Sequence, residues 1–180
     1  FFDYDNDTDL DIIQTNGFPM AQDGEWTADP MRLWRNDGSG VYTEVSALEG
    51  ISDTREGKGL AVLDYDDDGD MDVFVVNNMD GPVLYQNNSS TNGNDYLRIA
   101  AEGSLDPATG LFASSPEGVG AKIVVTEDGF SQIWEMGAAS HHLGQSERVA
   151  HFGLGTATGD VDQITIFWPS GASQIFTNIP

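Results

Sequence analysis

Two nine-residue windows crowded with aspartate constrain the fold of this chain more than any other feature. They span Asp3–Asp11 and Asp64–Asp72, and their acids align position by position with a period of 61 residues. The aligned positions hold ten of the acids in a 180-residue chain whose net charge is -23. Such dense like charge usually belongs to solvated, disordered chain. Here each window leads directly into a β-branched and aromatic run, Ile12–Thr15 or Val73–Val76, which is typical of a buried strand. We therefore expect a bound cation to neutralise each window.

The spacing inside each window matches an oxygen cage for a hard cation. Carboxylates at positions 1, 3 and 5 of a tight loop converge, position 7 offers its backbone carbonyl, and position 9 closes the cage. Such a flexible set of oxygens suits Ca²⁺ better than Mg²⁺, and neither window contains the His or Cys that favours a transition metal. Gly69 stands at the turning position of the second window, where the first has Thr8. Position 12 of the second window is Val75 instead of a bidentate Glu, which excludes an EF-hand.

The match between the windows extends beyond the acids. Leu33-Trp34-Arg35-Asn36 recurs as Leu84-Tyr85-Gln86-Asn87, and an internal repeat of this length indicates a propeller or another stacked β architecture. With the preceding run Gly57–Asp64, these motifs resemble the FG-GAP or VCBS-type repeat of integrin-like β-propellers. In that family the acidic loop is a Ca²⁺ site. The resemblance implies two Ca²⁺ ions, held by Asp3, Asp5, Asp7, Asp11 and the carbonyl of Asp9, and by Asp64, Asp66, Asp68, Asp72 and the carbonyl of Asp70.

The composition changes after residue 93, where the acids thin out and alternating patterns appear. Six short strands separated by turn signals are expected here, which argues for an antiparallel sandwich or barrel. They are Tyr96–Ala100, Ala121–Thr126, Ser131–Met136, Val149–Leu154, Asp162–Trp168 and Gln174–Phe176. The predicted fold class is therefore all-β. Residues 1–93 form two FG-GAP/VCBS-like repeats, the first truncated at its start and the whole only propeller-like, and residues 94–180 form a second, β-sandwich or barrel domain.

Four motifs in this second part share the order and spacing of a known family. Gly118–Lys122, Gln145-Ser146, His151–Gly155 and Trp168–Gly171 together resemble the ASPIC/UnbV domain, which follows FG-GAP repeats in the cartilage acidic protein family and in secreted bacterial proteins. Where that family commonly has Leu-Ser-Gln, this chain has Leu143-Gly144-Gln145. The resemblance implies an architecture and carries no catalytic chemistry with it.

The three histidines predict no active site. His151 lies in an alternating strand, where a hydrogen-bonded structural role is expected. His141 and His142 lie in an expected loop, and such pairs are common in loops that have no catalytic role. Gly153–Gly155 lacks the third glycine, the following helix and the lysine of a phosphate-binding loop. We therefore expect that the chain is not an enzyme.

Charge and open edges indicate the class of partner. The acidic excess repels phosphate backbones, which excludes nucleic acid, and no apolar run reaches the ~18 residues of a membrane span. Fewer than two full repeats leave sheet edges that pair readily. We expect a secreted, extracellular calcium-binding structural or adhesive module. Its expected partners are other copies of the protein or extracellular matrix components, assembled into a matrix or filament.

A carbohydrate-binding accessory domain of a secreted hydrolase or lectin is the alternative. Its glycan would stack on exposed aromatic rings, and Trp26 and Trp34 are the candidates because they lie in or beside a long insertion in the first repeat. Formal N-glycosylation acceptors occur at Asn6, Asn87 and Asn88, the last two in the Asn- and Ser-rich linker.

Overall fold

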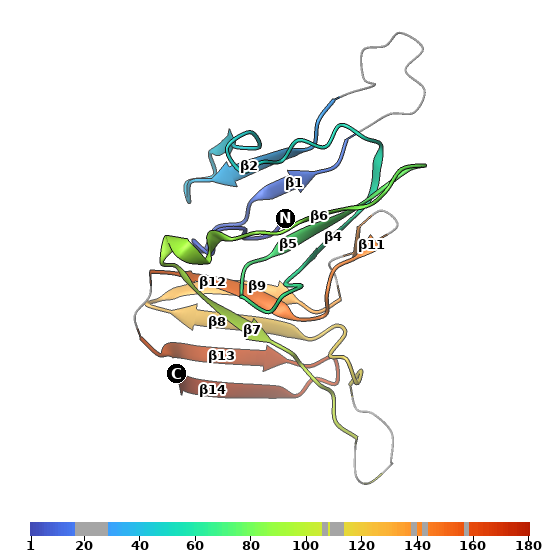
Figure 1. Ribbon diagram of the computed structural model, residues 1–180. Helices are drawn as coiled ribbons and strands as arrows, with labels where there is room; N and C mark the ends of the chain where they lie inside the picture. The colour runs from blue at the N-terminus through green and yellow to red at the C-terminus, as the bar shows by residue number, and fades with distance from the viewer. Residues whose placement is uncertain (17–28, 106–107, 109–113, 138–139, 142–143, 157–158) are drawn as a thin grey trace.

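The computed structural model describes residues 1–16, 29–105, 108, 114–137, 140–141, 144–156 and 159–180 (Figure 1). The regular secondary structure of these residues consists of antiparallel strands and one short 3-10 helix, η1 (Ser89–Asn92). The strands are β1 (Ile12–Gln14), β2 (Arg32–Asn36), β3 (Tyr42–Glu44), β4 (Gly57–Leu63), β5 (Asp72–Asn77), β6 (Val83–Tyr85), β7 (Asp95–Ile99), β8 (Lys122–Glu127), β9 (Phe130–Glu135), β10 (Ser140–His141), β11 (Gly144–Gln145), β12 (Ala150–Gly155), β13 (Val161–Phe167) and β14 (Ser173–Ile179). The predicted all-β fold class is confirmed.

The first half contains two three-stranded sheets, β1-β2-β3 and β4-β5-β6, in which β1–β2 and β5–β6 are equivalent pairs. The third strand differs: β3 pairs with β2 in the first sheet, whereas β4 pairs with β5 in the second. In both sheets the two residues that follow the acidic window pair with the first two residues of the recurring four-residue motif. The pairs are Ile12 with Trp34 and Ile13 with Leu33 in β1–β2, and Val73 with Tyr85 and Phe74 with Leu84 in β5–β6. The sequence repeat therefore fixes strand register as well as loop composition.

One face of each sheet packs into a common core. In β5, Val73 and Val75 are buried, whereas Phe74 and Val76 between and beyond them are exposed, as the alternation of a strand requires. The first sheet contributes Leu33, and Ile13 packs against the same cluster. The two stacked sheets agree with the expected propeller-like arrangement.

The second half forms two layers around a separate core. A four-stranded sheet has the order β14-β13-β8-β9, and β12 pairs with β7. Ile123 and Ile166 from the larger sheet share a cluster with Ala150 and Phe152 from β12. All six expected strands are present within a few residues of their predicted bounds, and the described residues close no barrel. The short pair β10–β11 had no signal in the sequence, and it lies against β4 (Figure 1).

Candidate metal centres

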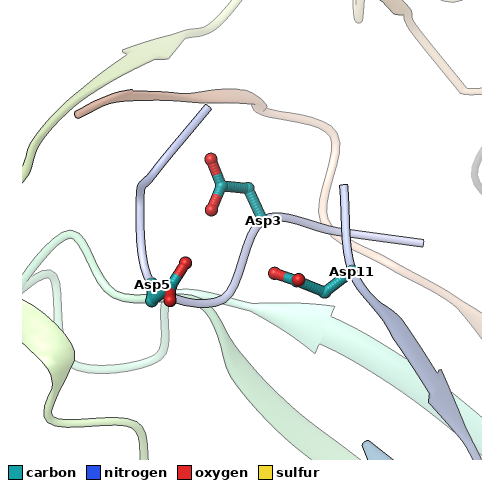
Figure 2. Close-up of side chains that lie close together, drawn as sticks. All are labelled: Asp3, Asp5 and Asp11. Carbon is teal, nitrogen blue, oxygen red and sulfur yellow. The ribbon is translucent and has the colours of Figure 1, made fainter. Parts of the chain in front are cut away.

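Three carboxylates of the first acidic window converge on one point (Figure 2). Asp3, Asp5 and Asp11 each offer an oxygen atom, and these oxygens all lie within 4.8 Å of one another. Backbone amides hold the group in place: Asp3 accepts from Thr8 N at 2.9 Å, and Asp11 accepts from Tyr4 N at 3.0 Å. Since Asp3 and Asp11 are buried, this loop concentrates charge in a site largely shielded from water.

The second window repeats this geometry. Asp64, Asp66 and Asp72 also offer oxygens within 4.8 Å of one another. Asp64 accepts from Gly69 N at 3.0 Å, and Asp72 accepts from Tyr65 N at 2.9 Å. Each of these hydrogen bonds has its counterpart 61 residues earlier. The two clusters are thus copies of one backbone design.

The Asn of the four-residue motif completes each cage from outside the loop. Asn36 N donates to Asp11 Oδ1 at 2.8 Å, and Asn87 N donates to Asp72 Oδ1 at 2.7 Å. This Asn recurs visibly in the sequence as Asn36 and Asn87, but its role in the cage was not predicted. Its amide orients the last carboxylate of the cage and ties the loop to the end of β2 in the first copy and of β6 in the second.

The other predicted ligand residues lie beside the clusters. The carboxylates of Asp7 and Asp68 accept from the backbone amides of Asp9 and Asp70, at 3.0 and 2.9 Å, and so shape the turn. Asp9 and Asp70 were expected to offer only their carbonyls. The structure therefore brings together three of the five predicted residues in each loop, and the five-residue ligand sets remain predictions.

Burial raises the pKa values of the first cluster. It raises the pKa of Asp3 to about 8 and that of Asp11 to about 7, and burial together with the charge of Asp7 raises the pKa of Asp5 to about 6. In the second cluster burial raises the pKa of Asp72. Charged carboxylates are therefore costly here without a counter-ion, because burial and mutual repulsion both favour the protonated form.

The first cluster also has an oxygen with no partner. Asp5 Oδ1 is buried and accepts no hydrogen bond from the described residues. A buried carboxylate oxygen without a partner is unfavourable and needs an explanation. Three convergent carboxylates and one unsatisfied oxygen fit a hard cation that takes oxygen ligands.

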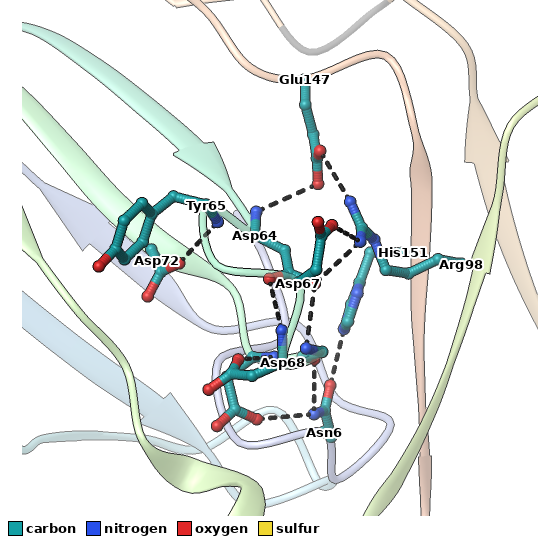
Figure 3. A network of polar contacts seen from close by, with 11 residues as sticks. Asn6, Asp64, Tyr65, Asp67, Asp68, Asp72, Arg98, Glu147 and His151 are labelled. Carbon is teal, nitrogen blue, oxygen red and sulfur yellow. Dashed lines mark hydrogen bonds and ion pairs between the residues drawn. The ribbon is translucent and has the colours of Figure 1, made fainter.

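The second cluster has protein partners of its own (Figure 3). Arg98 Nη1 lies 2.9 Å from Asp64 Oδ2 and 3.1 Å from Asp67 Oδ1, and Arg98 Nη2 lies 3.0 Å from Glu147 Oε2. Gln86 Nε2 donates to Asp66 at 2.6 Å. The roles of Arg98 and Glu147 were not predicted from the sequence, because no local pattern shows that β7 and the segment between β11 and β12 lie against this loop.

Residues of both loops also contact the second half of the chain directly. Asn6 Oδ1 lies 2.7 Å from His151 Nε2, and Asn6 O accepts from Gly155 N at 2.8 Å. Gly69 lies so close to Tyr96 that an added β carbon would sit 1.8 Å from the ring. The Tyr96 ring in turn stacks on His151, with centroids 5.9 Å apart. The loops therefore join the two halves of the chain.

The remaining residues singled out in the sequence have varied positions. His151 is buried in β12, and burial lowers the pKa of its imidazole to about 4. His141 belongs to β10, whereas His142 and Trp26 lie outside the described residues. Trp34 is half-buried in β2. Of the formal glycosylation acceptors, Asn6 is buried and Asn88 is exposed.

Comparison with known proteins supports both resemblances. Residues 3–75 match the model of the FG-GAP-like repeat, and residues 111–180 match the model described as ASPIC and UnbV. The chain is 27% identical over 173 residues to Cartilage acidic protein 1 of Homo sapiens, covering 94% of this chain and 24% of that protein. For the Xenopus tropicalis protein of the same name the identity is 27% over 179 residues, covering 97% of this chain and 25% of the relative. The chain thus spans about a quarter of the length of these curated relatives. No helix within the described ranges has the length and apolar character needed to cross a membrane.

Proposed function

We propose, on the premise that this chain carries an FG-GAP-like repeat followed by an ASPIC and UnbV segment, that it is a calcium-binding structural module of an extracellular protein. The observation that carries the proposal is the first cluster, where three carboxylates converge and Asp5 Oδ1 has no partner. A Ca²⁺ ion there would be held by Asp3, Asp5 and Asp11, and one in the second loop by Asp64, Asp66 and Asp72. Each ion would offset the repulsion between carboxylates that the fold forces together.

Ca²⁺ bound in these loops would increase the free energy of unfolding of the chain. Each loop leads into a strand of its local sheet, β1 or β5, and also contacts the second half of the chain, so a loosened loop disturbs both contacts. Binding to the folded state alone stabilises it by about 2.7 kcal/mol per site at a ligand concentration of 100 Kd. For a chain of this size that corresponds to a rise in melting temperature of about 5–10 °C per site.

Differential scanning calorimetry of the metal-free chain, with and without Ca²⁺, tests the proposal. We expect the melting temperature to rise with Ca²⁺ and to fall again with EGTA, and titration calorimetry to give two ions per chain. The variant Asp5→Asn lowers the response, whereas Asp160→Asn, an exposed acid outside the loops, leaves it unchanged. A melting temperature that ignores both Ca²⁺ and EGTA would contradict the calcium function.

The module is further proposed to act by contact and not by catalysis. His151 packs in the junction with its Nε2 on Asn6, an arrangement that supports a structural role for this imidazole. Its proposed partners are other copies of the protein or extracellular matrix components, and its proposed setting is outside the cell, where the calcium concentration suits weak cages. The similarity to Cartilage acidic protein 1 supports this setting.

A further inference from the structure

The strand pair β7–β12 presents alternate residues to two different parts of the molecule. Leu97 and Phe152, which pair across the ladder, lie in or against the core of the second half. Tyr96, Arg98 and His151 stand beside them in the two strands and point to the opposite side, as the alternation of a strand requires. On that side they contact the acidic loops, so one strand pair connects the second core to both loops (Figure 3).

Strand β12 of this pair holds the first loop. His151 Nε2 lies 2.7 Å from Asn6 Oδ1, and Asn6 O accepts from Gly155 N at 2.8 Å. At Gly153 an added β carbon would sit 2.6 Å from Asn6 Cα and 2.1 Å from Asp3 Oδ2. The backbone of β12 therefore approaches this loop more closely than any residue with a side chain would allow.

Strand β7 of the same pair holds the second loop. An added β carbon at Gly69 would sit 1.8 Å from the Tyr96 ring, and Arg98 Nη1 lies 2.9 Å from Asp64 Oδ2. Arg98 is the cross-strand partner of His151, and the Tyr96 ring stacks on the His151 imidazole with centroids 5.9 Å apart and an interplanar angle of 13°. The residues that contact different loops therefore also contact each other.

Asn6 joins the two loops directly as well. It stands at position 4 of the first window, between Asp5 and Asp7, and has φ +58. Its Nδ2 donates to Gly69 O at 3.3 Å and to Asp70 Oδ1 at 3.4 Å, both in the second window. Because Asn6 and Asp70 are buried, these bonds are stronger than the same bonds at the surface. A change in the shape of the first loop thus disturbs the second.

We propose that Asn6 and the β7–β12 pair couple the two acidic loops, so that Ca²⁺ bound in one loop increases the affinity of the other. The inference rests on the calcium function proposed above and adds its regulation. Repulsion among carboxylates favours looser conformations of an empty loop, in which the shared contacts are weakened. An ion in the first loop orders Asn6 and His151, so the second loop loses less conformational freedom when it binds. Such coupling is reciprocal, and we expect it to amount to about fivefold or more.

Titration calorimetry measures the coupling as a cycle. Asp5→Asn leaves only the second loop to bind Ca²⁺, and Asp66→Asn leaves only the first. We expect the product of the two association constants of the wild type to exceed the product of these single-site constants by about fivefold or more. Asn6→Gly keeps the left-handed backbone but removes the amide, so in its background the excess disappears, although every charge is unchanged. Asn178→Gly, at an exposed position of β14 with φ +53, is the matched control and keeps the excess.

Hydrogen exchange gives a second readout at a loop that holds no ion. In Asp66→Asn, at a Ca²⁺ concentration that fills only the first loop, we expect the amides of residues 65–72 to exchange more slowly. His151→Phe removes the donor to Asn6 and abolishes this protection, whereas His151→Gln keeps an N–H donor and retains most of it. Circular dichroism confirms that each variant is folded.

Two results overturn the coupling. One is a wild-type chain whose two sites bind independently, and the other is an excess that persists unchanged in both Asn6→Gly and His151→Phe. Either result leaves the calcium function intact, because two ions still bind. A chain that binds fewer than two ions contradicts the calcium proposal itself, so the two failures are distinguishable.

Discussion

The two acidic loops share one backbone and differ in what surrounds them. Asp3 lies beside the backbone of Gly153, where an added β carbon would sit 2.1 Å from Asp3 Oδ2, and no arginine contacts it in any ion pair of the described residues. Its counterpart Asp64 has the guanidinium of Arg98 at 2.9 Å. Asp3 thus faces neutral backbone, whereas Asp64 pairs with a cation supplied by the protein. Arg35 forms no ion pair with the first cluster among the described residues and acts on Asp5 only through its charge, which opposes the rise in pKa that burial causes at that carboxyl.

The carboxylates at position 3 of the two windows, Asp5 and Asp66, also differ in burial and in hydrogen bonding. Asp66 is exposed and its carboxylate accepts from Gln86, whereas Asp5 is half-buried and keeps an unsatisfied oxygen. The second loop has the more regular sequence, because it has a glycine at its turn. The first loop nevertheless has the greater need for an ion. Regularity of a motif and dependence on its ligand are therefore separate properties, and we expect the first loop to bind Ca²⁺ more tightly.

The largest effect is expected from Gly69→Ala. Gly69 has φ +90, a left-handed conformation, and its β carbon would sit 1.8 Å from the Tyr96 ring. Backbone strain and the forced movement of the ring together cost about 3 kcal/mol, measured by denaturant unfolding. Gly171→Ala is the matched control, since Gly171 has φ +88 and no atom within 4 Å of an added β carbon. An equal loss of unfolding free energy in the two variants would show that contact between Tyr96 and this loop does not contribute to the effect.

The second largest effect is expected from removing the positive charge of Arg98. Arg98→Gln keeps most of the side-chain length but removes a positive charge 2.9 Å from a proposed ligand. We expect Ca²⁺ affinity at the second loop to rise about tenfold, or 1.4 kcal/mol, because the guanidinium no longer repels the ion. Titration calorimetry in an Asp5→Asn background isolates this site. Arg55→Gln removes an arginine paired with Asp53 away from both loops and serves as the control. An unchanged or lower affinity means that Arg98 orients the cage instead of competing with the ion.

The pH dependence of the metal-free chain offers a third distinction. The folded-state pKa of Asp3 is raised to about 8 and that of Asp11 to about 7, so between pH 6.5 and 8 the folded state binds more protons than the unfolded state. Stability then falls as pH rises through this window. His151 opposes this trend at the lower end of the window, because its pKa is about 4 when folded and near 6.5 when unfolded. The Phe1 amino group, whose pKa burial lowers, also opposes it, so the fall in stability is the excess of the two carboxyl groups over these two cations.

The measurement is the melting temperature in metal-free buffer from pH 6.5 to 8. We expect a fall of a few degrees, which saturating Ca²⁺ removes because the ion takes the place of the bound protons. Asp3→Asn flattens the metal-free profile, since the amide does not titrate. A metal-free melting temperature that rises across this window would show that the first cluster stays charged without an ion.

The sequence predicted the loops and strands because these are local features. Position-by-position spacing identified Asp3 and Asp64 as starts of equivalent cages, and strand patterns located all six strands of the second half. The surroundings of each loop depend on chain segments that pass over it from far away. Arg98 is 34 residues from Asp64, and nothing in either segment indicates that they meet. The difference between the loops was therefore visible only in three dimensions.

One difference between the loops was visible in the sequence, namely Thr8 in the place of Gly69, and it leads to the smallest predicted effect. Thr8 has φ +83 where its counterpart Gly69 has +90, so a β-branched residue holds a glycine conformation. Thr8→Gly relieves about 1–2 kcal/mol of strain, and the added freedom of the unfolded chain takes back about 0.5–1 kcal/mol. We expect a net gain of about 0.5 kcal/mol in denaturant unfolding. Thr43→Gly, at an exposed strand position, loses stability instead. If Thr8→Gly also loses stability, the threonine side chain itself supports the first loop, since its methyl group would lie only 3.6 Å from a β carbon at Gly155.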